Sequence, residues 1–385
     1  MSEAVIKEVF SVKQNENYCS SCAICSTLCP YEALTKDPET GKIFLEIEKC
    51  QVCGLCYSTC PAKAIDTIYY DTASLARYLD NARQKYASDN LVIMCRGSAP
   101  DFATVGKMFE LSDFIPMSVP CVGRIPDEIL FHAISKGIKK LYILACDEDY
   151  CRYQRGSSVA IRKVHALNRI LEQLGYGKDV IVFQQNSLKV KVDTDLCIAC
   201  GNCVYFCPYN AASLTGRGSV SFDLSLCRGC GLCVAMCPAL ALDLENWEKQ
   251  QISALITKTV PELASPKMLV FRCQWAAFPS LEDEEVAANT GIIDLPCASR
   301  MDVSHILEAF LAGIDGVLIA ACDEDDCKQE KASGKAQHSI EKFTDKLSQI
   351  NLQDRLRFCT VAPRNPDKFV GEIEQFSQDL KAMVT

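Results

Sequence analysis

The chain has 385 residues, 25 of them cysteines, and its formal net charge at pH 7 is −9. This acidic balance argues against nucleic acid as a partner, because phosphates attract proteins with an excess of Lys and Arg. Hydrophobic residues make up 49% of the chain, which is enough for several cores. A chain of this length is expected to form two to four domains.

The first 18 residues contain no apolar stretch of the signal-peptide type, because Glu3, Lys7, Glu8 and Lys13 interrupt them. No apolar run approaches the roughly 18 residues that a membrane helix needs. We therefore expect a cytoplasmic protein without a membrane span, whose thiols stay reduced rather than forming disulfides. So many thiols available to metal also favour an anaerobic setting.

Two cysteine runs near the N-terminus share the spacing Cys-x2-Cys-x2-Cys-x3-Cys-Pro. They are Cys19, Cys22, Cys25, Cys29 with Pro30, and Cys50, Cys53, Cys56, Cys60 with Pro61. This is the ligand pattern of bacterial two-cluster ferredoxins, in which the fourth cysteine of each run binds the other cluster. A tight turn can aim three thiolates at one cluster, so the fourth ligand must come from elsewhere. The predicted [4Fe-4S] ligand sets are Cys19, Cys22, Cys25 and Cys60, and Cys50, Cys53, Cys56 and Cys29.

The same pair of runs recurs later in the chain. The runs are Cys197, Cys200, Cys203, Cys207 with Pro208, and Cys227, Cys230, Cys233, Cys237 with Pro238. By the same rule, one further [4Fe-4S] cluster is predicted on Cys197, Cys200, Cys203 and Cys237, and another on Cys227, Cys230, Cys233 and Cys207. Structural zinc is the alternative, although zinc usually takes pairs of Cys-x2-Cys rather than runs of four.

The whole chain is an internal duplication. Cys19 and Cys197 lie 178 residues apart, and Cys146 and Cys322 lie 176 apart. All cysteines pair in this way except Cys359, which we expect to be a buried apolar residue on the last strand. A fixed period of this kind indicates repeated structural units. The predicted domains are a ferredoxin module over 1–72, an α/β module over 73–187, a second ferredoxin module over 188–246 and a second α/β module over 247–385.

In each half, nearly continuous apolar strands alternate with helices after the ferredoxin module. In the first half, a short strand over 64–70 and a helix over 73–88 come first. The next expected strands cover 91–95, 117–121, 141–146 and 180–183, with helices over 126–135 and 159–174. In the second half, strands are expected over 268–273, 292–297, 317–322 and 356–361, with helices over 303–312 and 339–350. This pattern indicates a parallel sheet covered on both faces, so the fold class is α/β combined with α+β ferredoxin modules.

Further cysteines are expected at the carboxyl ends of these strands. In the first half they are Cys95, Cys121 and Cys146, with Cys151 in the following loop; in the second half they are Cys273, Cys297, Cys322 and Cys327. Open parallel sheets bind ligands at this edge, and four thiolates around one point suit a [2Fe-2S] cluster or zinc. Two alternatives remain open. The cysteines could be small apolar core residues, or Cys146 and Cys151 could form a redox disulfide.

Two segments resemble the MvhD/FlpD family of iron–sulfur subunits, which link hydrogenase or formate dehydrogenase to heterodisulfide reductase. They begin PCVGRIPDEILFHAISKG at residue 120 and LPCASRMDVSHILEAFLAG at residue 295. Similar domains occur in HdrA-like and Qmo-type proteins. The resemblance covers about 90–185 and 267–363 and implies a [2Fe-2S] cluster on such cysteines. The family's first strand typically ends in Cys-x-Trp-Cys, whereas Cys95 and Cys273 are not followed by a second thiol.

No catalytic motif is recognisable. The chain has no Gly-x-Gly-x-x-Gly or Walker sequence, so no flavin or NAD is expected on this chain, and a flavin would belong to a partner. The four histidines have no counterparts in the repeat and are expected to be surface or helix residues; they are His132, His165, His305 and His338.

Two charged runs flank the first strand-end cysteines. The acidic run Asp147–Asp149 would lower a cluster's reduction potential, because net charge sets that potential. A basic run follows, which could offset this charge, meet an acidic partner, or simply form a solvated face. It consists of Arg152, Arg155, Arg162 and Lys163.

The predicted function is therefore single-electron relay. The chain would carry four [4Fe-4S] and two [2Fe-2S] clusters, connecting a flavin-containing HdrA-like or bifurcating subunit to a dehydrogenase, hydrogenase or reductase. One alternative is a thiol/disulfide or polysulfide reductase that uses Cys146 and Cys151, and Cys322 and Cys327. Another is a double ferredoxin whose α/β modules are inert docking domains.

Overall fold

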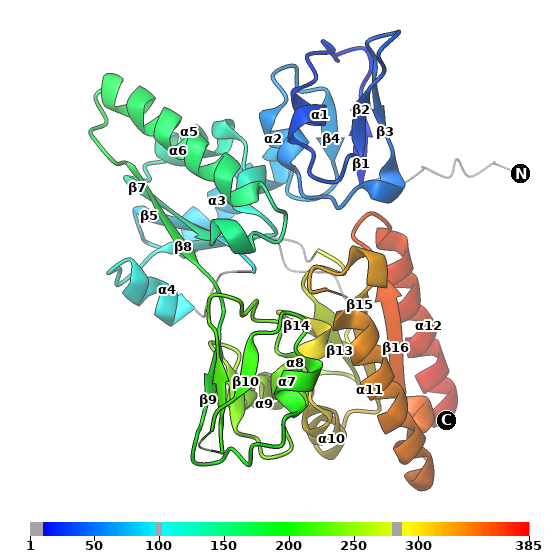
Figure 1. Cartoon of the computed structure of the whole chain (residues 1–385). Coiled ribbons are helices and arrows are strands. Elements are labelled where there is room, and N and C mark those ends of the chain that lie inside the picture. Colours follow the sequence, from blue (N-terminus) through cyan, green and yellow to red (C-terminus); the bar gives the residue numbers. More distant parts are fainter. Residues whose placement is uncertain (1–10, 98–101, 217, 279–286, 331, 385) are drawn as a thin grey trace, which may run out of the picture.

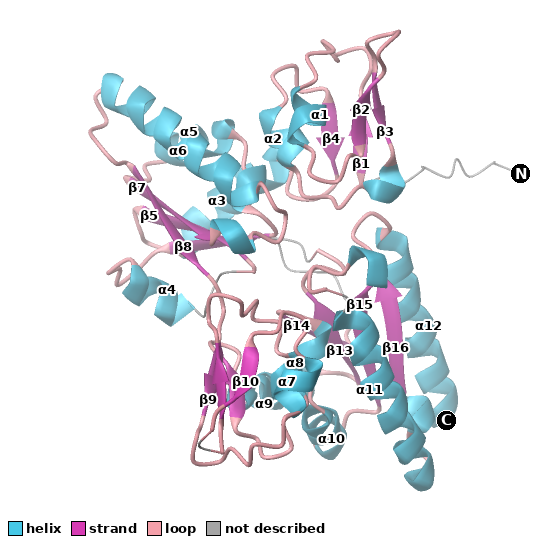
Figure 2. Ribbon diagram, in the orientation of Figure 1, coloured by secondary structure: helices cyan, strands magenta, loops and turns pink. Residues whose placement is uncertain are grey.

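The computed structural model describes residues 11–97, 102–216, 218–278, 287–330 and 332–384. Its two halves follow one plan, in which a small cysteine-rich region precedes a four-stranded sheet with helices (Figure 1). Figure 2 shows how loops dominate the cysteine-rich regions, whereas helices and strands dominate the sheet regions. Residues 1–10, which belong to the segment where no signal peptide is expected, lie outside the described residues.

Each cysteine-rich region contains two antiparallel strand pairs and two helices of one turn. In the first region the elements are β1 (Val12–Gln14) paired with β4 (Ile65–Thr67), β2 (Leu34–Lys36) paired with β3 (Ile43–Leu45), α1 (Ile24–Leu28) and α2 (Leu55–Thr59). In the second they are β9 (Val190–Val192) paired with β12 (Leu242–Leu244), β10 (Ala212–Leu214) paired with β11 (Val220–Phe222), α7 (Asn202–Phe206) and α8 (Leu232–Ala235). These small antiparallel pairs are the α+β part of the expected fold.

Each half also contains the expected four-stranded parallel sheet. The first has the order β6-β5-β7-β8, with β5 at Asn90–Cys95, β6 at Ile115–Val119, β7 at Lys140–Cys146 and β8 at Ile181–Asn186. The second has the order β14-β13-β15-β16, with β13 at Met268–Cys273, β14 at Thr290–Leu295, β15 at Gly316–Cys322 and β16 at Leu356–Val361. In both sheets the first strand lies inside, so consecutive strands depart from it on opposite sides. This is the topology that creates a ligand site at the carboxyl edge.

Helices cover both faces of the first sheet, as its apolar strands predict. Alternate residues of β5 point to opposite faces: Ile93 belongs to the large core, and Met94 to a smaller core that includes Val105 of α4. In Figure 1, α4 lies on one side of this sheet and α3, α5 and α6 lie on the other. Their bounds are α3 Thr72–Lys85, α4 Phe102–Met108, α5 Asp127–Ser135 and α6 Gly156–Gln173.

The second sheet is packed by helices α9 (Lys249–Thr259), α10 (Val303–Leu311), α11 (Ala332–Leu347) and α12 (Pro366–Val384). The expectation for Cys359 is correct, because this cysteine lies on β16 and is buried there. Across the described parts of the chain, no helix combines the length and the apolar character needed to cross a membrane.

Some expected bounds are wrong. The strands β6 and β14 end two residues before Cys121 and Cys297, because the intervening Pro120 and Pro296 have no N–H to donate to a strand neighbour. The helix expected over 339–350 begins seven residues earlier, at the start of α11. Helices α4, α9 and α12 were not expected, since short or evenly mixed segments give a weak periodic signal.

The two halves pack against each other through aromatic side chains. Tyr153 of the first half and Trp275 of the second meet edge to face, with ring centroids 5.6 Å apart. Tyr69 and Phe278 make a similar contact at 5.3 Å. A Cβ added to Gly97 would lie 2.8 Å from the Trp275 ring, so the two segments approach closely there. Core residues of the two sheets form one continuous cluster as a result.

Candidate metal centres

Four cavities in the cysteine-rich regions are each lined by four cysteines. In the first region, one cavity is lined by Cys19, Cys22, Cys25 and Cys60, and the other by Cys29, Cys50, Cys53 and Cys56. In the second region, one is lined by Cys197, Cys200, Cys203 and Cys237, and the other by Cys207, Cys227, Cys230 and Cys233. We call the first of each pair the outer cavity and the second the inner cavity. The structure thus brings together the same sets of four cysteines that are predicted when the fourth cysteine of each run is assigned to the other cluster.

Left-handed backbone conformations wrap each run around its cavity. In the second run, Val52 has φ of 51° and Gly54 has φ of 79°. The N–H of Val52 then donates to Cys50 Sγ at 3.4 Å. Inward-pointing amides of this kind form a concavity that favours anions. Gly229 and Gly231 repeat the geometry in the second half, with φ of 62° and 77°. The loops therefore prepare a site for negatively charged sulfur.

The donor set in these cavities fits an iron–sulfur cluster. Burial raises the pKa of Cys53 and of Cys230 to about 12, so these thiols would be protonated at neutral pH without a bound cation. A coordinating metal removes the proton. Among the described residues, no three His, Cys, Asp or Glu side chains converge as closely as a single metal ion requires. Thiols spread around a cavity suit a cluster, whose iron atoms take separate ligands.

A fifth group of cysteines lies at the carboxyl edge of the first sheet. Cys95 and Cys146 end β5 and β7, and Cys121 follows β6. Hydrogen bonds with the thiols of Cys121 and Cys146 are the main reason why the pKa of Cys95 lies well above its usual value. The fourth member, Cys151, is half-buried, and a Cβ on Gly156 would lie 2.3 Å from Cys121 Sγ and 3.3 Å from Cys151 Sγ. The four thiols of this strand-end group are therefore neighbours.

The second sheet carries an equivalent strand-end group. Cys273 ends β13 and Cys322 ends β15, and their Sγ atoms are 3.5 Å apart. Cys297 also hydrogen-bonds to Cys273 and accepts a hydrogen bond from Ser299 Oγ at 3.1 Å. Burial raises the pKa of Cys327, and the charge of Cys297 adds to the rise, so these two also lie close together. The expected four thiols are therefore neighbours in both halves.

A buried arginine stands between each inner cavity and the strand-end group of the same half. Arg124 is fully buried, and its Cβ and Nε lie 2.8 Å and 3.0 Å from the position of a Cβ on Gly54. Its guanidinium donates to Val52 O at 3.5 Å and also to Tyr69 O. Arg300 is likewise fully buried against Gly231. The loops on which they lie begin at the strand-end cysteines.

The cysteine spacing alone predicts no role for these arginines. A signal was present, because an arginine follows the strand-end cysteine by three residues in both PCVGR and PCASR. Its partners, however, come from the cysteine-rich region some 70 residues earlier in the chain. Spacing within the motif does not show that contact.

Most of the basic run after Cys151 makes contacts inside the molecule. Arg155 donates to Thr27 O at 2.5 Å, and Lys163 donates to Ser58 O at 3.3 Å and to Ile125 O at 3.0 Å. Arg162 is exposed. The run therefore serves mainly to hold α6 near the cysteine-rich region.

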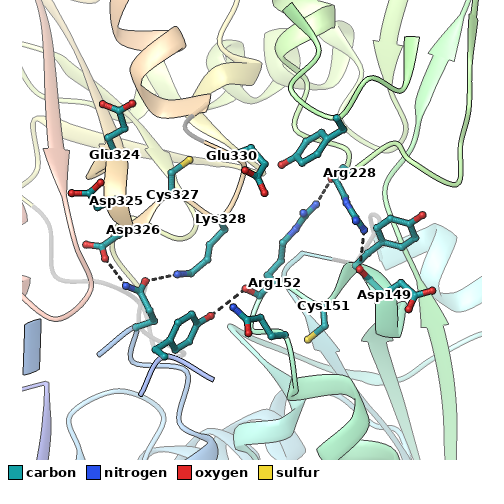
Figure 3. Close-up of a pocket in the computed structure, with 15 residues that line it drawn as sticks. Asp149, Cys151, Arg152, Arg228, Glu324, Asp325, Asp326, Cys327, Lys328 and Glu330 are labelled. Atoms are coloured by element: carbon teal, nitrogen blue, oxygen red, sulfur yellow. Dashed lines mark hydrogen bonds between the residues drawn. The ribbon is translucent and has the colours of Figure 1, made fainter. Parts of the chain in front are cut away.

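A cleft of about 480 Å³ opens where the two halves meet (Figure 3). Cys151 of the first strand-end group and Cys327 of the second both line it, from opposite walls. Tyr31 and Tyr209, which are equivalent in the repeat, line it as well. The two strand-end groups therefore open into one shared space.

Two equivalent cations cross this junction. Arg152 of the first half donates to the carbonyl oxygen of Arg228 in the second cysteine-rich region. Lys328 of the second half donates to Gln51 Oε1 in the first. Figure 3 shows both contacts as dashed lines across the cleft. Each half thus reaches the inner cavity region of the other.

The histidines lie on helices, as expected. His305 is buried on α10, with Nε2 3.3 Å from the carbonyl oxygen of Lys249. His132 on α5 lies 3.0 Å from Asp80 Oδ1. His165 and His338 are exposed on α6 and α11. Within the described residues, none of them lines a cysteine cavity.

Known family models match both the cysteine-rich regions and the sheet regions. The model of a family described as the delta subunit of methyl-viologen-reducing hydrogenase, FlpD, matches residues 92–193 and 268–384. Models of 4Fe-4S dicluster domains match residues 11–61 and 190–244. The FlpD matches together cover more than half of the chain, and they coincide with the two parallel sheets and their helices.

Curated relatives match the chain over different lengths. The chain is 27% identical over 319 residues to a subunit of the ferredoxin:CoB-CoM heterodisulfide reductase of Methanosarcina mazei, which is 78% of this chain and 37% of that protein. It thus spans less than two fifths of the length of this relative. It is also 27% identical over 124 residues to an iron-sulfur subunit of the vhc F420-non-reducing hydrogenase of Methanococcus voltae, which is 31% of this chain and 86% of that protein.

Each comparison agrees with the cysteine pattern of the region that it covers. The runs of four cysteines lie within the dicluster matches, and the strand-end groups lie within the FlpD matches. The chain is therefore an iron–sulfur electron-transfer protein that belongs to the family of methyl-viologen-reducing hydrogenase delta subunits, with two FlpD domains and two 4Fe-4S dicluster domains in one polypeptide.

Proposed function

We propose that this chain relays single electrons through six iron–sulfur clusters held in four modules, over 1–72, 73–187, 188–246 and 247–385. Each outer and inner cavity would hold one [4Fe-4S] cluster on the four cysteines that line it. Each strand-end group would hold one [2Fe-2S] cluster. When bound, each cluster takes up and releases one electron, and its protein surroundings set the potential.

The grouping of the cysteines carries this proposal. Four cavities are each lined by four cysteines, although each set comes from two runs, and the eight strand-end cysteines form two further groups of neighbours. Only Cys359 stays outside them. A protein that used its cysteines as ordinary apolar residues would have no reason to bring them together in fours.

The groups also follow one another in an order that suits a relay. Burial raises the pKa of Cys53 in the first inner cavity to about 12, and the charge of Cys121 in the strand-end group adds to the rise. Burial likewise raises the pKa of Cys230, with a contribution from Cys297. At the junction, burial lowers the pKa of Lys328, and negative charge on Cys322, Asp326 or Cys53 would act in the opposite direction. Inner cavity, strand-end group and opposite half are therefore neighbours in turn.

The outer cavities offer faces for other proteins. Around the cavity of the second region, Ile198, Tyr205 and Leu214 are 65%, 82% and 52% exposed. Apolar side chains beside an exposed thiol such as Cys200 suit a partner that covers them during electron transfer. We propose that a flavin-containing HdrA-like protein binds one end and a dehydrogenase, hydrogenase or reductase binds the other, in the cytoplasm of an anaerobe. The names of the heterodisulfide reductase and hydrogenase relatives support this pairing.

Iron content tests the proposal. Protein purified under anaerobic conditions should contain about 20 iron atoms per chain, because four [4Fe-4S] and two [2Fe-2S] clusters are expected. Cys146→Ser should lose about two of them, together with one [2Fe-2S] signal in the EPR spectrum of the reduced protein. The matched control is Cys359→Ser, which should keep the full content because Cys359 belongs to no group.

Other outcomes would point elsewhere. A wild-type content of about 16 iron atoms, unchanged in Cys146→Ser, would contradict the strand-end clusters. Free thiols that titrate at Cys146 and Cys151 would then favour a disulfide or polysulfide reductase. Inert thiols would favour a double ferredoxin with docking domains.

A further inference from the structure

The two strand-end groups are equivalent in the repeat, but they face different charges. Arg124 beside the first group has no carboxylate within salt-bridge distance among the described residues. Its guanidinium donates to the carbonyl oxygens of Val52 and Tyr69 and lies 5.0 Å from the centre of the Tyr70 ring. Its Nε is buried without a hydrogen-bond partner. This cation is therefore buried without a neutralising side chain.

The equivalent arginine of the second half is neutralised. Arg300 Nη2 lies 3.2 Å from Asp243 Oδ1. Asp302 is also nearby, but it pairs with Lys249 Nζ at 3.4 Å, so these two charges balance each other. Asp243 corresponds in the repeat to Asp66, which is exposed and forms no ion pair with Arg124 in the described part of the chain. The same guanidinium position thus carries a net positive charge in the first half, whereas an ion pair occupies it in the second.

A second difference lies next to the first strand-end cysteine. Arg96 follows Cys95, and its Nη2 donates to the Tyr70 hydroxyl at 2.6 Å. Its Nη1 is buried without a hydrogen-bond partner, and no described carboxylate forms a salt bridge with the guanidinium. The equivalent residue after Cys273 is Gln274, an uncharged side chain that donates to Pro296 O at 3.2 Å. The first group therefore gains another cation that the second lacks.

Among the residues that the structure describes, the other charges nearby do not cancel this difference. Near the second group, Arg272 is paired with Asp294 at 2.7 Å, and Asp326 is paired with Arg364 at 2.5 Å, so both pairs are neutral. Arg228 does replace the neutral Gln51 in the second half, but it lies in the ferredoxin region and is half-exposed, so solvent screens it. Arg152 and Lys328 occupy equivalent positions in the repeat, so each half has one cation there.

A buried cation without a counter-ion is unfavourable unless another negative charge lies near it. A cluster held by four thiolates supplies that charge, and one more electron makes the cluster still more negative. A nearby cation therefore stabilises the reduced state and raises the reduction potential, because the net charge around a cluster sets that potential. Burial makes the effect larger than it would be in water.

We propose that Arg124 and Arg96 hold the reduction potential of the first strand-end group above that of the second, so that electrons pass from the second half to the first. The inference rests on the proposed relay function. In the transfer, the second group is oxidised by one electron and the first is reduced by one, and no bond forms or breaks. An electron donor of the flavoprotein class would supply the second half, and an acceptor protein would empty the first. The arginines are positioning residues and do not themselves react.

Redox titration followed by EPR tests the order of the two potentials. In Cys273→Ser/Cys322→Ser the remaining [2Fe-2S] signal belongs to the first group, and in Cys95→Ser/Cys146→Ser it belongs to the second. We expect the signal of the first group to appear at the higher potential. The equilibrium constant for electron transfer from the second group to the first should be at least tenfold in favour of the first, which is a difference of about 59 mV for one electron. Equal potentials or the reverse order would overturn the inference. If the wild type shows no [2Fe-2S] signal, the proposed function fails instead.

Charge variants then test the cause. Arg124→Gln should lower the potential of the first group, whereas Arg124→Lys should keep it near the wild-type value. Asp243→Asn, a milder change, should raise the potential of the second group and leave the first unchanged. Exposed Arg169→Gln on α6 is the control and should shift neither. A structural role alone would change cluster content without this opposite pair of shifts, and unshifted potentials in both charge variants would disprove the assignment.

Discussion

The double variant Cys22→Ser/Cys60→Ser is expected to lose about four iron atoms per chain, whereas Cys22→Ser/Cys29→Ser should lose about eight. The reason is the exchange between runs. Cys22 and Cys60 line the same outer cavity, although they belong to different runs. Cys29 lines the inner cavity instead, so the second variant damages two sites. Iron and acid-labile sulfide, measured on anaerobically prepared protein, give the difference directly.

The second half provides an internal repetition of this test. Cys200→Ser/Cys237→Ser should lose about four iron atoms, and Cys200→Ser/Cys207→Ser about eight, because the cavities have the same exchanged lining. The opposite pattern in either half would mean that each run holds its own cluster. Equal losses in all four variants would show that the two clusters of one region assemble only together.

The variant Trp275→Ala is expected to weaken the junction between the two halves. The free energy of unfolding should fall by about 3–5 kcal/mol, the usual effect of removing a large buried aromatic side chain. Trp275 is only 2% exposed and packs against Tyr153 from the other half. A Cβ at Gly97 would lie 2.8 Å from its ring, so the truncation would open a cavity beside this glycine. Denaturant unfolding of the cluster-containing protein under anaerobic conditions would show a lower midpoint.

The matched control for this variant is Tyr205→Ala. Tyr205 is 82% exposed, so its removal should change stability by no more than about 0.5 kcal/mol. If both variants unfold at the same denaturant concentration, the aromatic contact does not hold the halves together. Loss of iron in Trp275→Ala alone would show that the junction also protects the strand-end clusters.

The cysteine groups could be predicted from the sequence because their spacing is covalent information. Three thiols within seven residues must turn around one point, and the proline after the fourth marks where the chain leaves. The parallel sheets were predictable for a similar reason, since strands such as β5 and β15 are apolar on both faces. Duplication strengthened each inference, because every pattern appeared twice.

The remaining features depend on contacts between distant segments. Arg124 becomes a buried cation only because the loop around Gly54 folds over it, and no local pattern encodes that meeting. The ends of β6 and β14 are set by single prolines, Pro120 and Pro296. Because each proline lies within a continuous apolar segment, the apolar pattern does not show where the strand ends. The cleft between Cys151 and Cys327 required knowing how the halves dock.

The covalent linkage of the two halves has an evolutionary consequence. In a homodimer of identical chains, a mutation near one copy of a site appears near its twin as well, so both sites keep the same energy. Here each copy is encoded separately, and differences such as Arg96 opposite Gln274 can accumulate on one side alone. Fusion thereby allows a symmetric scaffold to acquire a preferred direction.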